Sequence, residues 1–258
     1  MSERSVSFDR AAEFYDRTRT FDKETDRAET ALLVAELAYR RAVLEPGVGT
    51  GQVGLRLHAS GVRMFGVDLS TAMLRKLAEK SGGVAPFPIA AGDATRLPFR
   101  DGAFDGVVMR HVLHLIPAWR DVVSQLARVL ARPAVILVSH GESDLGRALR
   151  LRAEEIIGRP IRAVGLDWHS WPLLEREMGR IGGVHRTLAP VPYRVAEPLM
   201  ELIEGIEGNV FSWTWHMTDQ ERTAIAEGVR PWLEERYGPL DVPFQHEAPV
   251  TWHAYDLR

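Results

Sequence analysis

The 258-residue sequence contains no cysteine. Disulfide bonds, zinc sites with thiolate ligands and thiol nucleophiles are therefore excluded. It also lacks an uninterrupted apolar run long enough to cross a bilayer. Its first ten residues are polar and charged, without the apolar core of a signal peptide. From these absences we expect a soluble, cytoplasmic protein.

The sequence also lacks a marked excess of either basic or acidic residues. The chain has 32 basic and 35 acidic residues and a formal net charge of −3. This balance gives no electrostatic footprint for DNA or RNA. We therefore expect a small-molecule substrate, with no nucleic-acid or membrane partner, and a monomer or homodimer. The length and the hydrophobic fraction of 45% suit one large α/β domain with insertions.

Short apolar segments alternate with helical patterns over the first part of the chain, which favours βαβ units and a mostly parallel sheet. The strands are predicted at residues 41–45, 62–67, 88–91, 104–109 and 134–138. The last of these is the most continuously apolar, which is typical of a central strand covered on both faces.

Helices are predicted at both ends of this core. A first long helix runs from Lys23 to Tyr39, with an apolar face made of Ala28, Ala31, Leu32, Ala35 and Leu37–Ala38. Further along the chain, residues 185–195 are predicted to form a strand. Because this strand contains two prolines, which cannot donate main-chain hydrogen bonds, we expect it at the edge of the sheet. Residues 250–257 form a last strand, and the helical stretch between these two strands is an insertion.

A glycine-rich segment at residues 43–54, VLEPGVGTGQVG, follows the first strand and precedes a helix. Gly47, Gly49 and Gly51 stand at alternate positions, and glycine lets a ligand lie against the main chain. The helix behind them points N–H groups and a partial positive charge at the ligand. An anionic or strongly polar part of a nucleotide-like ligand is the natural occupant.

Two interpretations of this segment compete on the pattern alone. Residues 49–54 satisfy the G-x-G-x-x-G dinucleotide pattern, and Asp68 follows the next strand, where a ribose hydroxyl would be bound. A nicotinamide oxidoreductase is therefore one hypothesis. The other is a glycine-rich turn that binds no ligand.

The motifs along residues 41–140 resemble those of the class I S-adenosylmethionine-dependent methyltransferases. Residues 43–51 are similar to their first motif, and GVDLS at 66–70, followed by Met73-Leu74, is similar to their second. AGDA at 91–94 and LPFRDGAFD at 97–105 are similar to the third and fourth. Residues 8–19 resemble the opening of the small-molecule branch. A departure is ARPA at 131–134, where the family usually has a Pro-Gly-Gly turn.

The resemblance implies a fold and a domain plan. The fold is α/β, a doubly wound, mostly parallel sheet of seven strands in which the last is antiparallel. Residues 1–258 form a single methyltransferase domain. Its parts are an N-terminal helical flap at 1–40, a cofactor-binding core at 41–140 and a helical lid at 196–240, inserted between the last two strands.

The implied cofactor is S-adenosylmethionine, and its chemistry agrees with the residues present. Glu45 can accept a hydrogen bond from the ammonium group, while the glycine backbone approaches the carboxylate. Asp68 can accept both ribose hydroxyls, and Asp93 can accept from the adenine amino group. The predicted cofactor-binding residues are Tyr15, Arg19, Glu45, Gly47, Gly49, Gly51, Asp68, Leu69, Met73, Asp93, Ala94, Arg110 and His111. The Tyr15 ring could face the sulfonium in a cation–π arrangement.

Three histidines follow the strands that end at the expected methyl position. His111 and His114 come after the fourth strand and His140 after the fifth, and they are the candidate catalytic residues. A base is needed only if the acceptor holds its proton tightly, so structural hydrogen bonding is an equal alternative. No third ligand matches the His111-x-x-His114 pair, and no metal is expected.

An aromatic cluster in the second half could line an apolar substrate pocket. The candidate substrate-binding residues are Trp168, Phe211, Trp213, Trp215 and His216. The alternative is that these rings only pack the insertion onto the sheet. The predicted function is methyl transfer from S-adenosylmethionine to a small molecule. The alternatives are a nicotinamide oxidoreductase and a cofactor-binding protein without catalysis.

Overall fold

The computed structural model describes residues 22–139, 142–167 and 170–258. Within these residues the chain divides into two compact units. The first comprises residues 22–139, 164–191 (without 168–169) and 250–258, and the second comprises residues 142–163 and 192–249.

The first unit is built on a seven-stranded sheet with the order β3-β2-β1-β4-β5-β9-β6. The strands are β1 (Val43–Pro46), β2 (Met64–Asp68), β3 (Ile89–Ala91), β4 (Phe104–Arg110), β5 (Leu130–Ser139), β6 (Gly183–Thr187) and β9 (His253–Leu257). In this order, the first five strands, β3, β2, β1, β4 and β5, are parallel to one another. Strand β9 is antiparallel to its neighbours β5 and β6. The predicted doubly wound sheet with an antiparallel last strand is confirmed.

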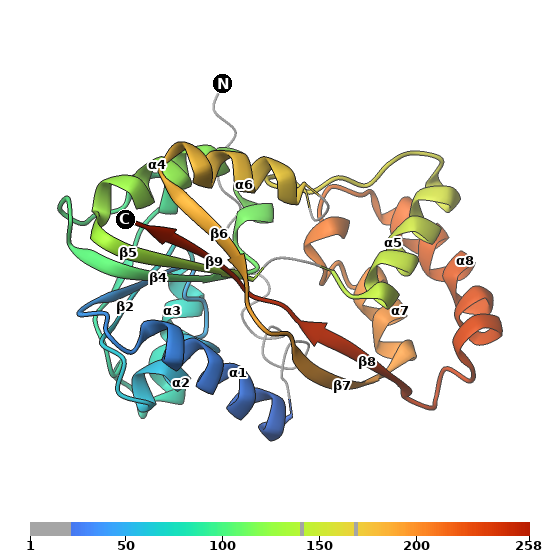
Figure 1. Ribbon diagram of the computed structural model, residues 1–258. Coiled ribbons are helices and arrows are strands. Elements are labelled where there is room, and N and C mark those ends of the chain that lie inside the picture. The colour runs from blue at the N-terminus through green and yellow to red at the C-terminus, as the bar shows by residue number, and fades with distance from the viewer. Residues whose placement is uncertain (1–21, 140–141, 168–169) are drawn as a thin grey trace. The chain divides into compact units, whose positions relative to one another are not determined.

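Helices cover both faces of this sheet. Figure 1 shows α1 (Lys23–Leu37) and α2 (Gly54–Ala59) on one face and α4 (Trp119–Val129) and α6 (Trp171–Arg180) on the other. Helix α3 (Thr71–Lys80) packs against β2 and β3. Because both faces are covered, β4 is buried from Phe104 to Met109 and β5 from Ala134 to Ser139. Strand β5 is thus interior, as its apolar run predicts.

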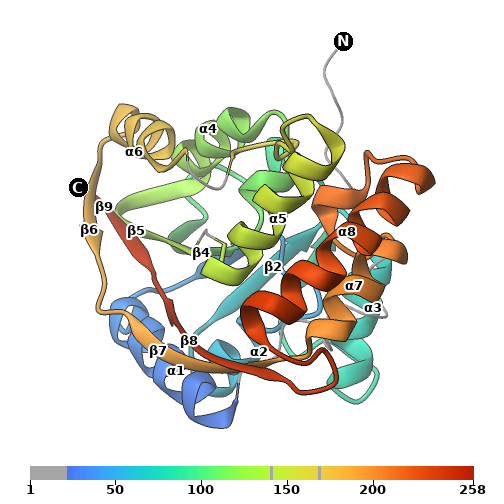
Figure 2. The ribbon, with the colours of Figure 1, turned by 90° about the vertical axis from the view of Figure 1, so that its right-hand side faces the viewer.

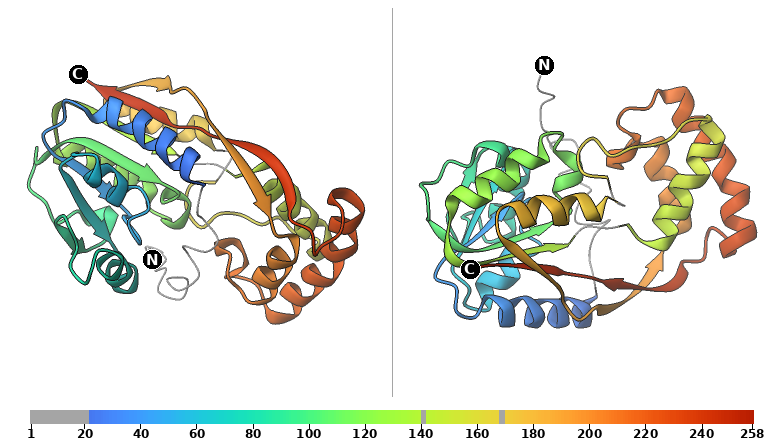
Figure 3. Two further views of the ribbon diagram at one scale, coloured as in Figure 1. Left: turned by 90° about the horizontal axis from the view of Figure 1, so that it is seen from below. Right: turned by 45° about the horizontal axis from the view of Figure 1, so that its top comes forward.

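The second unit is mainly helical. Helix α8 (Asp219–Tyr237) packs against α5 (Asp144–Ile157) and α7 (Leu199–Glu207), and the three helices can be followed in Figure 2. Strands β7 (Val191–Glu197) and β8 (Phe244–Val250) form a separate two-stranded sheet, seen from two sides in Figure 3. This unit contains the segment 196–240 that the sequence predicts as a lid, together with α5 and the β7–β8 sheet.

Two details differ from the sequence prediction. The expected strand 185–195 is two strands, β6 and β7, in different sheets, and the expected strand 250–257 is likewise divided between β8 and β9. Of these, β6 is an edge strand, as predicted. Each expected strand is interrupted where the chain leaves one sheet for the other. Between the strands, the N–H of Leu188 donates to the carbonyl of Trp252.

Of the predicted apolar face of the first helix, only Leu37 is buried and Leu32 is partly buried, so most of that prediction is wrong. The buried residues of α1 are Thr25, Glu29, Leu33 and Leu37, four residues apart, while Ala28, Ala31, Ala35 and Ala38 are exposed. The buried face includes the charged residue Glu29, so a search for regularly spaced apolar residues does not find it. Glu29 is fully buried because its charge is paired, as described below.

Two histidines lie side by side on β6 and β9. His185 Nε2 is 2.8 Å from His253 Nδ1, and His185 Nδ1 is 3.1 Å from Glu175 Oε1. Burial, together with the neighbouring His185, lowers the pKa of His253 from 6.5 to about 4. The folded state therefore resists protonation of His253.

This shift predicts a loss of stability in acid. Between pH 6.5 and about pH 4 the unfolded chain binds a proton at His253 that the folded chain does not bind, so stability falls as the pH is lowered through that window. We expect His253→Gln to remove about 1–2 kcal/mol of the stability difference between pH 7.5 and pH 5. Urea unfolding at both pH values measures it. Equal pH dependence in parent and variant would contradict the assignment.

Candidate functional site: the carboxyl edge of the first unit

The glycine loop joins β1 to α2 and is held against β2 by its main chain. The N–H groups of Gly47 and Val48 donate to the carbonyl of Val67, at 2.7 and 3.1 Å. Gly47 has φ 72°, and a Cβ at this position would lie 2.4 Å from Cγ2 of Val112, just beyond β4. Only glycine fits this close approach. The loop therefore lies directly against the segment that follows β4.

The carboxylate of Asp68, at the end of β2, fixes the middle of this loop. One oxygen accepts the N–H of Gly49 at 2.8 Å, and the other accepts the N–H of Ser70 at 2.8 Å. The Ser70 hydroxyl in turn caps α3 by accepting the N–H of Met73. Each carboxylate oxygen can accept more than one hydrogen bond. Asp68 can therefore hold the loop and bind a ligand hydroxyl together.

Glu45, in β1, lies beneath the loop and is 4% exposed. Its carboxylate accepts the N–H of Gly54, while Oε2 has no hydrogen-bond partner among the described residues. Burial raises the pKa of Glu45 well above its ordinary value; Arg56 opposes this shift and Asp68 adds to it. A buried carboxylate oxygen without a donor is costly, so this atom is suited to receive a donor from a ligand.

The end of β3 brings a third acid to the same edge. Asp93 Oδ1 accepts the N–H of Thr95 at 2.9 Å, and Ala94, the next residue after Asp93, is buried. Since β1, β2 and β3 are parallel neighbours, Glu45, Asp68 and Asp93 all lie at the carboxyl edge of the sheet. Beyond Asp68, Leu69 is 39% exposed, whereas Met73 in α3 is buried.

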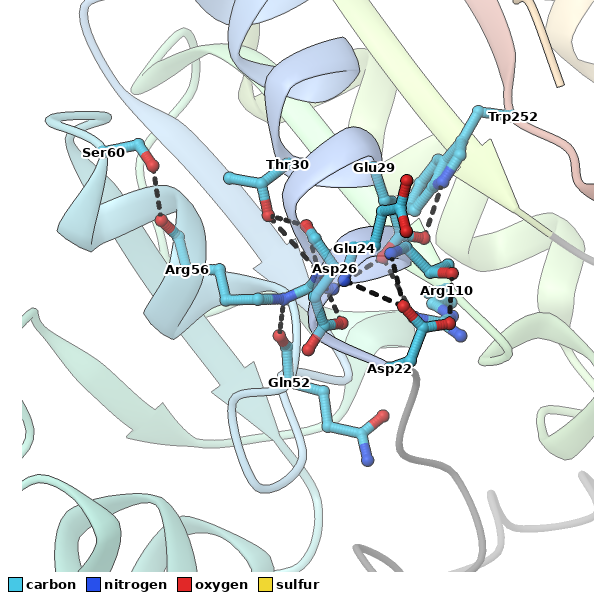
Figure 4. Close-up of polar contacts among 11 residues, drawn as sticks. Asp22, Glu24, Asp26, Glu29, Thr30, Gln52, Arg56, Ser60, Arg110 and Trp252 are labelled. Atoms are coloured by element: carbon cyan, nitrogen blue, oxygen red, sulfur yellow. Dashed lines mark hydrogen bonds and ion pairs between the residues drawn. The ribbon is translucent and has the colours of Figure 1, made fainter. Parts of the chain in front are cut away.

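Behind the loop lies a charged cluster that the sequence analysis missed. Glu29 is fully buried, and its Oε2 is 2.6 Å from Arg56 Nη2 and 3.3 Å from Arg110 Nη1. Its Oε1 accepts the Trp252 indole N–H at 3.0 Å. Figure 4 shows these side chains around Glu29, with Asp26 also pairing with Arg56. The cluster joins α1, α2, β4 and the segment before β9.

Comparison with known proteins identifies the family. A family profile described as a methyltransferase domain matches residues 44–138. The phosphatidylethanolamine N-methyltransferase of Cereibacter sphaeroides is 32% identical over 181 residues, which cover 66% of this chain and 86% of that protein. The chain belongs to the class I S-adenosylmethionine-dependent methyltransferases.

Other relatives agree over less of their length. The demethylmenaquinone methyltransferase of Clavibacter sepedonicus is 33% identical over 130 residues, 49% of this chain and 53% of that protein. The chain thus spans about half of that relative. A Thermotoga maritima structure, described as a possible histamine N-methyltransferase, has a TM-score of 0.57 at 17% identity and covers 97% of this chain and 98% of its own. At that identity the structural likeness shows the fold alone.

The methyltransferase uses S-adenosylmethionine as its cofactor, and the edge described above fits it. The unpartnered Oε2 of Glu45 suits an ammonium donor, and the Asp68 carboxylate suits a diol. The relatives named here are methyltransferases, so the nicotinamide oxidoreductase and the inactive cofactor-binding protein have no support. The individual contacts predicted for the cofactor-binding residues stay predictions.

Two of the methyltransferase's three predicted catalytic histidines, His111 and His114, follow β4. His111 has φ 52°, rare for a residue with a side chain, and its N–H donates to the Ser139 carbonyl at 3.1 Å. His114 is buried, and its ring centroid lies 6.4 Å from that of His111. His140, Tyr15, Arg19 and Trp168 lie outside the described residues. No cluster of metal-ligating side chains occurs in the described part of the chain, and none of its helices could cross a membrane.

The remaining predicted substrate residues lie in the methyltransferase's second unit. Phe211 and Trp213 stack at 6.0 Å and pack on the core of that unit. A Cβ on Gly205 would lie 2.6 Å from the Phe211 ring, and the Trp215 indole donates to the Asn209 carbonyl. His216 is exposed. Packing within the unit therefore accounts for part of this aromatic cluster.

We predict that Asp68→Ala weakens binding of S-adenosylhomocysteine at least ~10-fold, because hydrogen bonds to charged groups contribute about 1.5–3 kcal/mol each. It should also lower the melting temperature by a few degrees, since Gly49 and Ser70 lose their acceptor. Calorimetric titration and thermal melts measure the two effects.

Two control variants separate binding from stability. Ser70→Ala removes the hydroxyl that caps α3 and keeps the main-chain bond to Asp68, so it should lower the melting temperature with little change in affinity. Asp101→Ala, at an exposed ion pair with Arg128, should change neither. If Ser70→Ala lost as much affinity as Asp68→Ala, the affinity loss of Asp68→Ala would come from disorder of the loop and not from a lost contact with the ligand.

Proposed function

We propose that this methyltransferase transfers a methyl group to a small-molecule acceptor, with the cofactor bound at the carboxyl edge of the first unit. The observation that carries the proposal is the arrangement of Glu45, Asp68 and Asp93. These acids lie at or just beyond the carboxyl ends of three adjacent parallel strands, around a loop in which Gly47 permits a close approach to Val112. One of them has a buried oxygen that lacks a donor.

Each acid has its own proposed role. Glu45 Oε2 accepts from the cofactor's ammonium group, and the loop backbone lies against its carboxylate. Asp68 accepts the two ribose hydroxyls. Asp93 accepts from the adenine amino group, with the Ala94 N–H donated to a ring nitrogen. The exposed side chain of Leu69 is assigned to packing on the base, near the start of α3, where Met73 is buried.

The bound cofactor supplies an electrophilic methyl group on a sulfonium. The chain's contribution is to align the acceptor with that methyl group and to exclude water. His111 and His114 come directly after β4, at the same edge of the sheet as the glycine loop. His111 has a left-handed backbone conformation, and its N–H donates a hydrogen bond to the Ser139 carbonyl. This bond fixes the position of the main chain from which the imidazole projects. We assign it as the base when the acceptor needs one.

The acceptor is assigned to a broad class. The relative matched over most of its length is named for an amine-bearing phospholipid, which favours an acceptor with a nucleophilic heteroatom and an apolar part. Residues 196–240 lie outside the family match and carry the aromatic cluster, so we propose them as the lid that recognises the acceptor. A cytoplasmic location, the absence of a nucleic-acid partner and a monomeric or homodimeric state remain predictions.

A methyl-transfer assay tests the proposal. The protein is incubated with methyl-labelled S-adenosylmethionine and a panel of amines, phenols, thiols and carboxylic acids, both polar and apolar. We expect label in at least one class, with stoichiometric S-adenosylhomocysteine and reduced transfer by Asp68→Ala. A protein that binds S-adenosylhomocysteine but methylates no member of the panel would contradict the small-molecule assignment.

The role of His111 gives a separate prediction. His111→Asn keeps a residue that tolerates positive φ but removes the imidazole. For an acceptor that must lose a proton, we expect kcat to fall ~10²-fold or more and the acidic limb of the pH profile to disappear. His185→Asn, on edge strand β6, is the control and should keep the parent profile. An unchanged profile in His111→Asn would assign the ring a structural role.

A further inference from the structure

Two buried acids and two arginines lie at the base of the glycine loop. Both arginines act on Glu45, because Arg56 and Arg110 each lower its pKa against the effect of burial. Both nevertheless pair with Glu29, through the same oxygen. Glu45 has the Gly54 N–H as a donor, and its Oε2 has no hydrogen-bond partner. The positive charges are thus unequally shared between two acids.

The geometry of Glu29 explains this unequal sharing. Its Oε2 holds Arg56 at 2.6 Å and Arg110 at 3.3 Å, and its Oε1 is fixed by Trp252 at 3.0 Å. Arg56 is held further by the carbonyls of Gln52 and Asp26, at 2.7 and 2.9 Å. The fully buried Glu29 carboxylate is therefore held by three side-chain donors, from Arg56, Arg110 and Trp252.

We propose that Glu29 is a positioning residue that holds Arg56 and Arg110 away from Glu45, so that the Glu45 carboxylate remains available to the cofactor's ammonium group. The inference rests on the proposed contact between Glu45 and that ammonium. It extends the cofactor site to α1, which lies outside the segment matched by the family profile. Glu29 itself need not touch the cofactor.

Removal of the Glu29 charge has a definite consequence. Arg56 and Arg110, whose side chains are 22% and 11% exposed, would lose their shared acceptor, and a largely buried cation gains by pairing with another acid. Asp26 already accepts from Arg56, whereas Glu45 has an unused oxygen. An ion pair formed with Glu45 would then compete with the ammonium group of the incoming ligand.

The experiment compares two ligands in one variant. Glu29→Gln keeps the side-chain shape and the acceptor for Trp252 but removes the charge. S-adenosylhomocysteine carries the ammonium group, whereas 5′-methylthioadenosine has the same nucleoside and a thioether but no amino-acid portion. We expect the dissociation constant for S-adenosylhomocysteine to rise ~10-fold and that for 5′-methylthioadenosine to stay within about twofold.

The matched control lies two turns further along the same helix. Glu36 Oε2 pairs with Arg186 Nη2 at 2.6 Å, so Glu36→Gln makes the same chemical change in α1 without touching the cluster. It should leave both dissociation constants unchanged. Equal weakening of both ligands by Glu29→Gln would show general support of the fold and would overturn the proposal.

Two further variants keep each outcome decisive. If Glu29→Gln does not fold, Glu29→Asp keeps the charge but withdraws it by one methylene from both arginines, and the same selective loss is expected. Glu45→Gln tests the underlying contact. If Glu45→Gln selectively weakens S-adenosylhomocysteine binding but the Glu29 variants do not, the inference fails and the contact stands. If Glu45→Gln binds both ligands like the parent, the contact fails and the inference with it.

Discussion

The site depends on one pair of hydrogen bonds, those that the Asp68 carboxylate accepts from the main chain at Gly49 and Ser70. Through them a single charged group sets the shape of the glycine loop and the start of α3. The close approach between Gly47 and Val112 then fixes the loop against the segment after β4. These contacts link the carboxyl ends of β2, β1 and β4, which are neighbours in the sheet.

Charge placement behind this edge is the second constraint. Fully buried Glu29 pairs with Arg56 and Arg110, while Glu45, also buried, has an oxygen without a donor. A protein that only required stability would have little reason to leave a carboxylate in this state, since an unsatisfied buried polar atom is destabilising. An oxygen reserved for a ligand donor is the physical reason we assign to it. The stability lost at Glu45 is offset by the buried strands β4 and β5.

The sequence predicts the sheet and the strand-end acids well, because their signals are local. An apolar run followed by glycines or an acid marks each of β1, β2 and β3, and the continuous run at 134–138 marks β5. The Glu29 cluster was missed because its partners are 27, 81 and 223 residues away in the sequence. The four-residue spacing of Thr25, Glu29, Leu33 and Leu37 was the available signal. The division of the chain between two sheets near Leu188 and Trp252 depends on long-range pairing and has no local signature.

A crystal structure of the protein with S-adenosylhomocysteine tests the central claim most directly. We predict both ribose hydroxyls within hydrogen-bonding distance of the Asp68 carboxylate, at about 2.5–3.0 Å, and the ammonium group beside Glu45 Oε2. The bonds from Gly49 and Ser70 to Asp68 should persist. A ligand bound away from the glycine loop, or a ribose that contacts neither oxygen of Asp68, would contradict the account.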